Sequence, residues 1–145
     1  MTVILTKILK KMKKNHFIFA LLILFTAIVA SCSHRDDDHQ LVAIDKIKID
    51  SVKILIDTMD VYSVQSIRTY STYPSQCYGF DGYDYVHDGM NRVVTAYAWK
   101  NSGPCSQTTY TSFNQFNFKP VQTGTYTFKF WNGGTNYITK QIVVE

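Results

Sequence analysis

The stretch of sequence that decides the fold is Gly124-Thr-Tyr-Thr-Phe-Lys-Phe-Trp131. Successive side chains of a β-strand point to opposite faces, so every second residue here shares a face. One face is aromatic and consists of Tyr126, Phe128 and Phe130. The other face carries threonine and lysine. This strict alternation predicts a half-buried strand and does not fit the spacing of an amphipathic helix.

A tight turn and a return strand complete this hairpin. Asn132-Gly133-Gly134 permits the positive φ angles that such a turn needs. Residues 137–144 alternate again, and their apolar face is formed by Ile138, Ile142 and Val144. A second turn, at His87-Asp88-Gly89, is expected to join strands over residues 78–86 and 92–100.

The same alternation continues through the chain from Leu41 onward, and no stretch has the apolar i, i+3, i+4 spacing of a stable helix. Expected strands cover residues 44–49, 52–56, 63–71, 78–86, 92–100, 108–118, 125–131 and 137–144. Short strands separated by turn residues are typical of antiparallel sandwiches and barrels. We therefore predict that residues 41–145 form one all-β domain, an antiparallel β-sandwich of about seven to eight strands.

The segment before the final hairpin, Pro120-Val-Gln-Thr-Gly-Thr-Tyr-Thr-Phe128, resembles the start of a late strand in immunoglobulin-like domains. In those domains a Gly-x-Tyr step carries a corner tyrosine. The resemblance implies that the Tyr126 hydroxyl bonds back to nearby backbone. The tryptophan and cysteine positions differ from those of antibody domains, so the expectation concerns immunoglobulin-like architecture only.

The N-terminal residues have a different composition from the rest of the chain. Residues 1–16 are rich in lysine, and residues 17–30 form an apolar run of fourteen residues in which only Thr26 is polar. Spanning a bilayer core takes about twenty. A basic flank, a short apolar run and small residues at its end predict a signal peptide over residues 1–31. The alternative is an uncleaved anchor helix.

The end of the apolar run, Val29-Ala30-Ser31-Cys32, resembles the lipobox of bacterial lipoproteins. The resemblance implies that the Cys32 sulfur receives a diacylglyceryl group, that cleavage follows Ser31, and that the new amino terminus is acylated. Each buried methylene contributes about 0.8 kcal/mol, so two or three acyl chains hold a protein firmly to a membrane. Cys32 is then a membrane anchor rather than a nucleophile.

Residues 32–40 are polar and charged, which predicts a flexible tether. The triplet Asp36-Asp37-Asp38 is similar to the signal that exports Bacteroidota-type lipoproteins to the outer face of the outer membrane. The whole chain resembles small surface lipoproteins of that type, from which no activity carries over. The alternatives are an acidic run that only keeps the linker extended, and a lipoprotein that faces the periplasm.

The distribution of charge argues against nucleic acid as a partner. Five of the fifteen basic residues precede residue 15, whereas all eleven acidic residues lie at or after Asp36. From Cys32 onward the net charge is −1. A domain without a basic surface lacks the electrostatic attraction on which nucleic-acid binding depends.

Cys77 and Cys105 remain once Cys32 is assigned to lipid. An even pair in an oxidising compartment predicts one disulfide. Closing a loop of about 29 residues would stabilise the fold by roughly 3 to 4 kcal/mol. The alternatives are a two-cysteine metal site or two free thiols.

No catalytic motif stands out, and we expect neither enzymatic activity nor a cofactor. His34 and His39 fall in the tether, and Glu145 is the only glutamate. One cluster combines metal-ligating side chains, namely Asp81, Asp84, His87 and Asp88. Its spacing is not that of an EF-hand, and turn chemistry explains Asp88-Gly89. A structural turn is the preferred interpretation, and a metal site is the alternative.

Aromatic residues crowd around the expected disulfide: Tyr70, Tyr73, Tyr78, Phe80, Tyr83 and Tyr85. Strict alternation would prevent all the rings of one strand from facing the core, so some tyrosines are expected on the surface. Candidates for contact with a ligand are Tyr73, Tyr78, Tyr83 and Tyr85. The alternative is that these rings cover the sandwich edges and contact Trp99 or Trp131.

Asp50-Ser51-Val52 and Asp57-Thr58-Met59 resemble the O-glycosylation triplet of exported Bacteroidota proteins, which implies exposed Ser51 and Thr58. The expected function is a non-enzymatic, membrane-tethered binding or accessory module that contacts a glycan or an outer-membrane protein. One alternative is a structural envelope lipoprotein that braces a larger assembly. The other is a small metal-dependent enzyme that uses His87.

Overall fold

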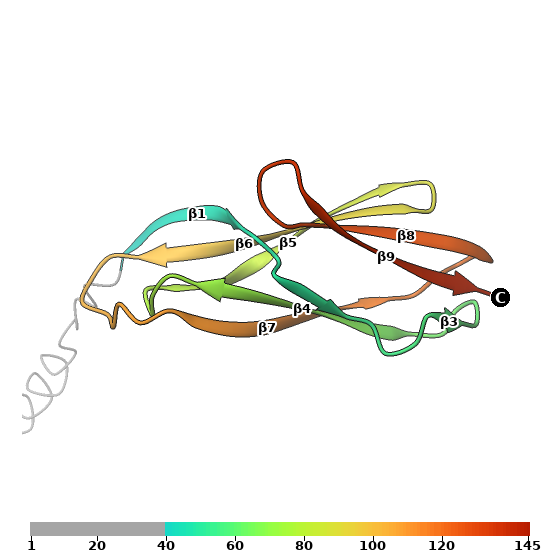
Figure 1. The fold of residues 1–145 in the computed structure, drawn as a ribbon, viewed down its shortest axis with the longest axis horizontal. Helices are drawn as coiled ribbons and strands as arrows, with labels where there is room; N and C mark the ends of the chain where they lie inside the picture. The colour runs from blue at the N-terminus through green and yellow to red at the C-terminus, as the bar shows by residue number, and fades with distance from the viewer. Residues whose placement is uncertain (1–39) are drawn as a thin grey trace, which may run out of the picture. The chain divides into compact units, whose positions relative to one another are not determined.

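The structure, a computed structural model, describes residues 40–145 and contains nine strands and no helix in that range (Figure 1). The strands are β1 (Leu41–Ile47), β2 (Ser51–Lys53), β3 (Thr58–Met59), β4 (Gln65–Tyr73), β5 (Tyr78–Asp88), β6 (Asn91–Asn101), β7 (Tyr110–Phe118), β8 (Gly124–Trp131) and β9 (Tyr137–Val144). Cys32 and the expected signal peptide and tether, except for Gln40, lie outside the described residues. Within these residues no helix is long and apolar enough to cross a membrane.

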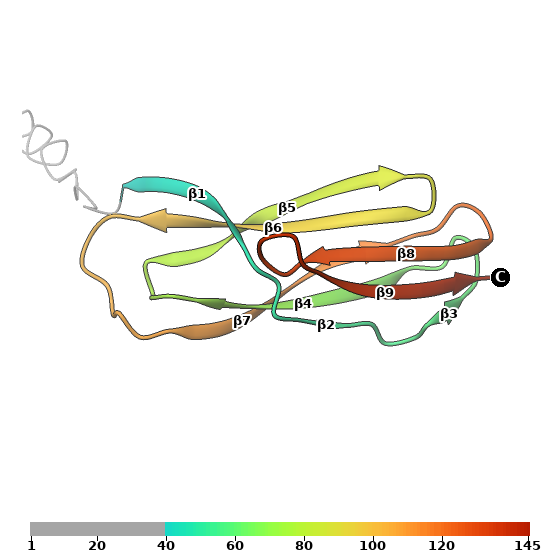
Figure 2. The same ribbon diagram turned by 45° about the horizontal axis from the view of Figure 1, so that its top comes forward.

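The strands form two sheets that lie face to face, as the two views in Figure 1 and Figure 2 show. One sheet has six strands and contains β1, β3, β5, β6, β8 and β9. The other has three strands in the order β2-β4-β7. The predicted all-β, two-sheet architecture is confirmed.

Strand β6 is the centre of the larger sheet. It pairs with β5 along one edge, and its other edge is shared by two strands. β1 pairs antiparallel with the second half of β6, whereas β8 pairs parallel with Asn91–Val94 in its first half. β3 and β9 are also parallel. The sandwich is therefore mixed rather than antiparallel throughout, because β1 leaves the sheet after Ile47 and frees half of that edge for β8.

The departure of β1 also changes the strand count. Residues 48–50, here called the crossing segment, carry the chain from the six-stranded sheet to β2 in the three-stranded sheet. The predicted strand over residues 52–56 is shortened to β2, which pairs with β4, and β3 is a short strand that was not predicted and that pairs with β9. Nine strands result instead of the expected seven to eight.

The core contains the hairpin face predicted from Gly124–Trp131. Tyr126, Phe128 and Phe130 are at most 1% exposed. Phe118 of the opposite sheet lies 5.0 Å, centroid to centroid, from both the Tyr126 and the Phe128 ring. The turn has φ angles of 97° at Gly133 and 56° at Gly134, as expected. The return strand buries Ile142 and Val144 and packs Ile138 against the core.

Two local predictions are confirmed at either end of the domain. The Tyr126 hydroxyl donates to the carbonyl oxygen of Gln122 at 3.1 Å, which ties the corner before β8 to the strand itself. Cys77 and Cys105 form a disulfide with their Cα atoms 5.6 Å apart. This bond connects the start of β5 to the loop between β6 and β7.

Candidate functional site

The crossing segment lies beside a groove with a volume of about 340 Å³. Side chains from both sheets line it, including Asp45, Lys46, Thr72, Pro74, Tyr78 and Trp131. The lining is mainly apolar, with two aromatic rings and several polar groups. This composition is typical of small-molecule sites, in which apolar walls give affinity and a few polar groups fix orientation. We call this feature the aromatic groove.

Trp131 is held in place at the end of β8. Alternation along β8 puts its side chain on the face opposite Tyr126, Phe128 and Phe130. Its indole Nε1–H donates to the carbonyl oxygen of Gly134 at 2.9 Å, and the Lys46 Nζ lies 5.9 Å from the ring centroid. The ring is therefore already oriented before any ligand arrives, which lowers the entropic cost of binding.

Tyr78 forms part of the groove from the first residue of β5. The Tyr110 hydroxyl donates to its carbonyl oxygen at 2.6 Å, and the next residue back along the chain is the disulfide-bonded Cys77. The Lys100 Nζ lies 5.5 Å from the Tyr78 ring centroid. The backbone of Tyr78 is thus held by a hydrogen bond and by the neighbouring disulfide, which places its ring at the groove.

Hydrogen bonds to the β8–β9 hairpin fix the crossing segment on one side. The backbone N–H of Ile49 donates to the Trp131 carbonyl oxygen at 3.0 Å. The Asn132 side-chain amide donates to the Ile49 carbonyl oxygen at 2.6 Å. Ile49 itself is fully buried. These bonds hold the turn of the hairpin and the groove wall at a fixed separation.

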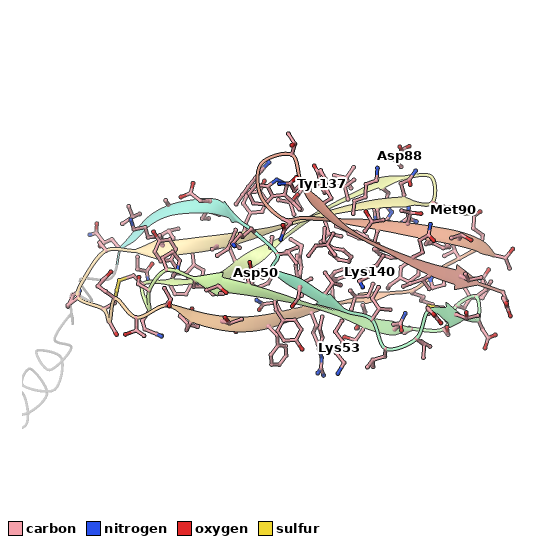
Figure 3. The ribbon with its side chains drawn as sticks, in the orientation of Figure 1. Asp50, Lys53, Asp88, Met90, Tyr137 and Lys140 are labelled. Carbon is pink, nitrogen blue, oxygen red and sulfur yellow. A yellow bond between two sulfur atoms is a disulfide. The ribbon has the colours of Figure 1, made fainter. Side chains whose placement is uncertain are left out.

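Asp50, labelled in Figure 3, fixes the crossing segment on its other side through a hydrogen bond and an ion pair. Its carboxylate accepts the backbone N–H of Thr72 at 2.8 Å and lies 3.0 Å from the Lys48 Nζ. Burial alone would raise the pKa of Asp50, but the hydrogen bonds from Lys48 and Thr72 outweigh it and hold this pKa below its ordinary value. The charged carboxylate therefore fastens the segment to β4 at neutral pH.

A larger hollow of about 480 Å³ lies next to β2 and β9, where Figure 3 labels Lys53 and Lys140. Its lining includes Lys53, Asp57 and Lys140 but no aromatic side chain. Its walls offer less apolar surface than those of the aromatic groove, and we regard the aromatic groove as the better candidate despite its smaller volume.

The four tyrosines predicted as ligand contacts have different positions. Tyr73 is 1% exposed and belongs to the core, where its ring stacks 5.0 Å from that of Tyr110. The Tyr83 hydroxyl lies 2.7 Å from Thr69 Oγ1 in the opposite sheet. Burial raises the pKa of both Tyr73 and Tyr83. Tyr78 lines the aromatic groove, and Tyr85 lines a separate, smaller cavity of about 240 Å³.

The expectation that alternation sends some of the rings of β5 to the outer face is wrong. The pairing of β5 with β6 shifts register between Phe80 and Gly82, which marks a β-bulge at Asp81. One extra residue changes which side chains share a face. Phe80 and Tyr83 therefore point the same way, with ring centroids 4.8 Å apart, and all four rings of β5 contact the core.

The remaining predicted positions are on the surface. Ser51 and Thr58 are exposed, which is the condition that a glycan would require. The cluster for which a metal site was the alternative to a structural turn, Asp81, Asp84, His87 and Asp88, is also exposed. Within residues 40–145 no three histidine, cysteine or acidic side chains come together in a group suited to a metal ion.

Trp131 is the aromatic residue of the groove that was not predicted from the sequence as a ligand contact. The sequence did contain a reason to select Trp131. It lies on the same face of its strand as Lys129, which is the exposed face, and a large aromatic ring on an exposed face indicates a role in binding. Lys46 and Thr72 gave no such indication, since they lie on strands of different sheets that are distant from each other in the sequence.

Comparisons with models of protein families, with curated proteins and with solved structures found no match for this chain.

Proposed function

We propose that this chain is an exported lipoprotein whose immunoglobulin-like β-sandwich binds a glycan, without catalysis, through the aromatic groove. The lipobox pattern at Cys32 and the acidic triplet after it support anchoring at the outer membrane, facing the cell exterior. The corner tyrosine supports the immunoglobulin-like architecture. The observation that carries the binding proposal is the presence of two aromatic side chains, Tyr78 and Trp131, in one groove.

The size and chemistry of the groove favour a saccharide over a protein partner. A volume of about 340 Å³ suits a ligand of one or two rings. A stable protein interface instead covers about 800 Å² on each partner. The apolar faces of sugar rings pack on aromatic side chains, while Asp45, Lys46 and Thr72 offer the acceptors and donors that sugar hydroxyls need.

The test uses the full chain, expressed with its N-terminal residues, extracted in a mild detergent and titrated with a panel of soluble oligosaccharides. The readout is isothermal titration calorimetry, because the heat of binding does not depend on the groove tryptophan that one of the variants removes. We expect Trp131→Ala and Asp45→Ala to weaken binding about tenfold or more, which corresponds to roughly 1.4 kcal/mol. Phe113→Ala is the matched control, since Phe113 is an exposed ring on the other sheet.

Binding that survives Trp131→Ala would place the site elsewhere on the domain. Absence of binding by any saccharide in the panel would contradict the glycan proposal and favour a protein that only braces a larger envelope assembly.

The surface location has a separate test on whole cells. Replacing Asp36, Asp37 and Asp38 with alanine should protect the domain from added protease, because the export signal would be lost. Unchanged cleavage would show that the acidic run is only a linker.

A further inference from the structure

Arg92, the second residue of β6, is buried without an acidic partner. Its side chain is 9% exposed, and the only ion pair found within residues 40–145 joins Lys48 and Asp50. Removing a charge from water is energetically unfavourable unless other groups compensate. The surroundings of Arg92 therefore need an explanation.

Part of the compensation comes from the turn between β5 and β6. The Nη1 group donates to the carbonyl oxygens of Gly89 and Asn91, and the guanidinium lies 5.0 Å from the Tyr126 ring centroid. The Nε–H, in contrast, is buried and has no hydrogen-bond partner. The Tyr85 side chain also shares a hydrogen bond with Arg92. Two carbonyl dipoles, a phenol and one aromatic face still leave the positive charge without a counter-charge.

A cavity of about 240 Å³ adjoins this guanidinium. It is lined by Tyr85, His87, Arg92, Asn117, Phe118 and Lys119. These side chains include a guanidinium, an amine, an imidazole, an amide and a phenol, but no carboxylate. Asp88, the nearest acidic residue along β5, is exposed at the turn (Figure 3) and does not line the cavity.

The Tyr85 hydroxyl adds a donor to the same cavity. Burial raises the pKa of Tyr85, and the neighbouring Arg92 guanidinium offsets only part of that rise. The phenol therefore remains protonated at neutral pH and is able to donate to an oxygen atom. Its ring is held edge-on against His87, with centroids 4.6 Å apart.

We propose that this cavity binds one oxyanion group, a carboxylate, sulfate or phosphate carried by a ligand, between Arg92 and Lys119. Such a group supplies the counter-charge that Arg92 lacks and accepts charge-assisted hydrogen bonds from a guanidinium, an ammonium and a phenol. Its oxygens have several lone pairs for these donors, whereas a neutral ligand would leave the charge uncompensated.

The oxyanion site and the aromatic groove are at opposite ends of the β5–β6 hairpin. Tyr78 and His87 are nine residues apart on β5, so the two sites are separated by roughly 30 Å. The oxyanion site is therefore a second site, and its proposal does not depend on the glycan proposal.

The test measures binding of sulfate, phosphate and glucuronate to the full chain in a chloride buffer, with sodium chloride added to equal ionic strength. The readouts are the melting temperature and the ¹⁵N–¹H resonance of the Arg92 Nε–H group. Sulfate and phosphate also stabilise proteins non-specifically, but that effect grows with concentration and does not saturate. We expect saturable binding by at least one of the three anions.

Lys119→Gln is the decisive variant, because Lys119 is exposed and its replacement leaves the turn contacts of Arg92 intact. We expect it to weaken anion binding roughly tenfold. Lys129→Gln, an exposed lysine on β8 outside the cavity, should leave binding unchanged. The anion that saturates at the lowest concentration distinguishes an acidic sugar from a sulfate or phosphate ester.

Two results would overturn the proposal. One is a stability increase that rises without saturation for all three anions and is the same in the wild type and in Lys119→Gln. The other is saturable binding that Lys119→Gln leaves unchanged.

Discussion

Gly79 in β5 provides a sharp test of how the larger sheet is packed. It pairs with Trp99 of β6, and the tryptophan ring covers it. A Cβ atom added at Gly79 would lie 2.1 Å from Trp99 Cζ2 and 2.5 Å from Cε2. Carbon atoms in contact prefer about 3.5 to 4.0 Å. Gly79→Ala therefore forces either the ring or the strand to move.

The cost follows from two opposing effects. Overpacking in a well-packed site costs typically about 1 to 3 kcal/mol. Replacing glycine in a strand by alanine recovers about 0.5 to 1 kcal/mol of conformational free energy. We expect a net loss of about 1 to 2 kcal/mol, which lowers the melting temperature by roughly 4 to 15 °C for a domain of this size.

Gly82→Ala is the matched control for this variant, because it lies in the same strand and an added Cβ would meet nothing within 4 Å. Denaturant unfolding should show that Gly82→Ala is neutral or slightly stabilised. Combining Gly79→Ala with Trp99→Ala should cost less than the sum of the single changes, since the clash disappears with the ring. Equal stabilities of Gly79→Ala and Gly82→Ala would refute the packing described here.

Three further predictions concern stability. Tyr126→Phe removes the bond to the Gln122 carbonyl and should lower the free energy of unfolding by about 1 kcal/mol, measured in urea; no change would mean that the corner bond contributes nothing. Reducing the Cys77–Cys105 disulfide should lower it by roughly 3 to 4 kcal/mol, measured with and without reductant; an equal midpoint would contradict this. Asp50→Asn should destabilise the domain by about 1 kcal/mol at pH 7. Because the pKa of Asp50 is lowered by folding, the advantage of the wild type is complete above the ordinary aspartate pKa of about 3.9 and disappears as the pH falls through the lowered value; a pH-independent difference would contradict it.

The sequence alone was sufficient to predict the features of the fold that depend on local alternation and turn chemistry. The buried face of β8, the glycine turn after it and the strands around Gly89 all follow from residues adjacent in the chain. The disulfide followed from counting cysteines. Few alternative strand registers compete with these features, because a one-residue slip in a half-buried strand would expose its whole apolar face.

Features that depend on long-range pairing were not predictable. The bulge at Asp81 shows no local signal other than the neighbouring glycine, yet it turns Tyr83 and Tyr85 toward the core. The crossing segment depends on how β1 and β8 divide one edge of β6. Because the aromatic groove is built by that division, only one of its two rings, Tyr78, was selected from the sequence as a ligand contact.

The most direct test of the central claim, an exported and lipid-anchored sandwich, is the intact mass of the protein extracted from its native membrane, before and after reduction. The account predicts a chain that begins at Cys32, carries added acyl mass and gains two hydrogen atoms on reduction of the disulfide. A chain that begins near Met1, or one without acyl mass, would contradict the claim. Cys32 would then be a free and reactive thiol rather than a lipid anchor.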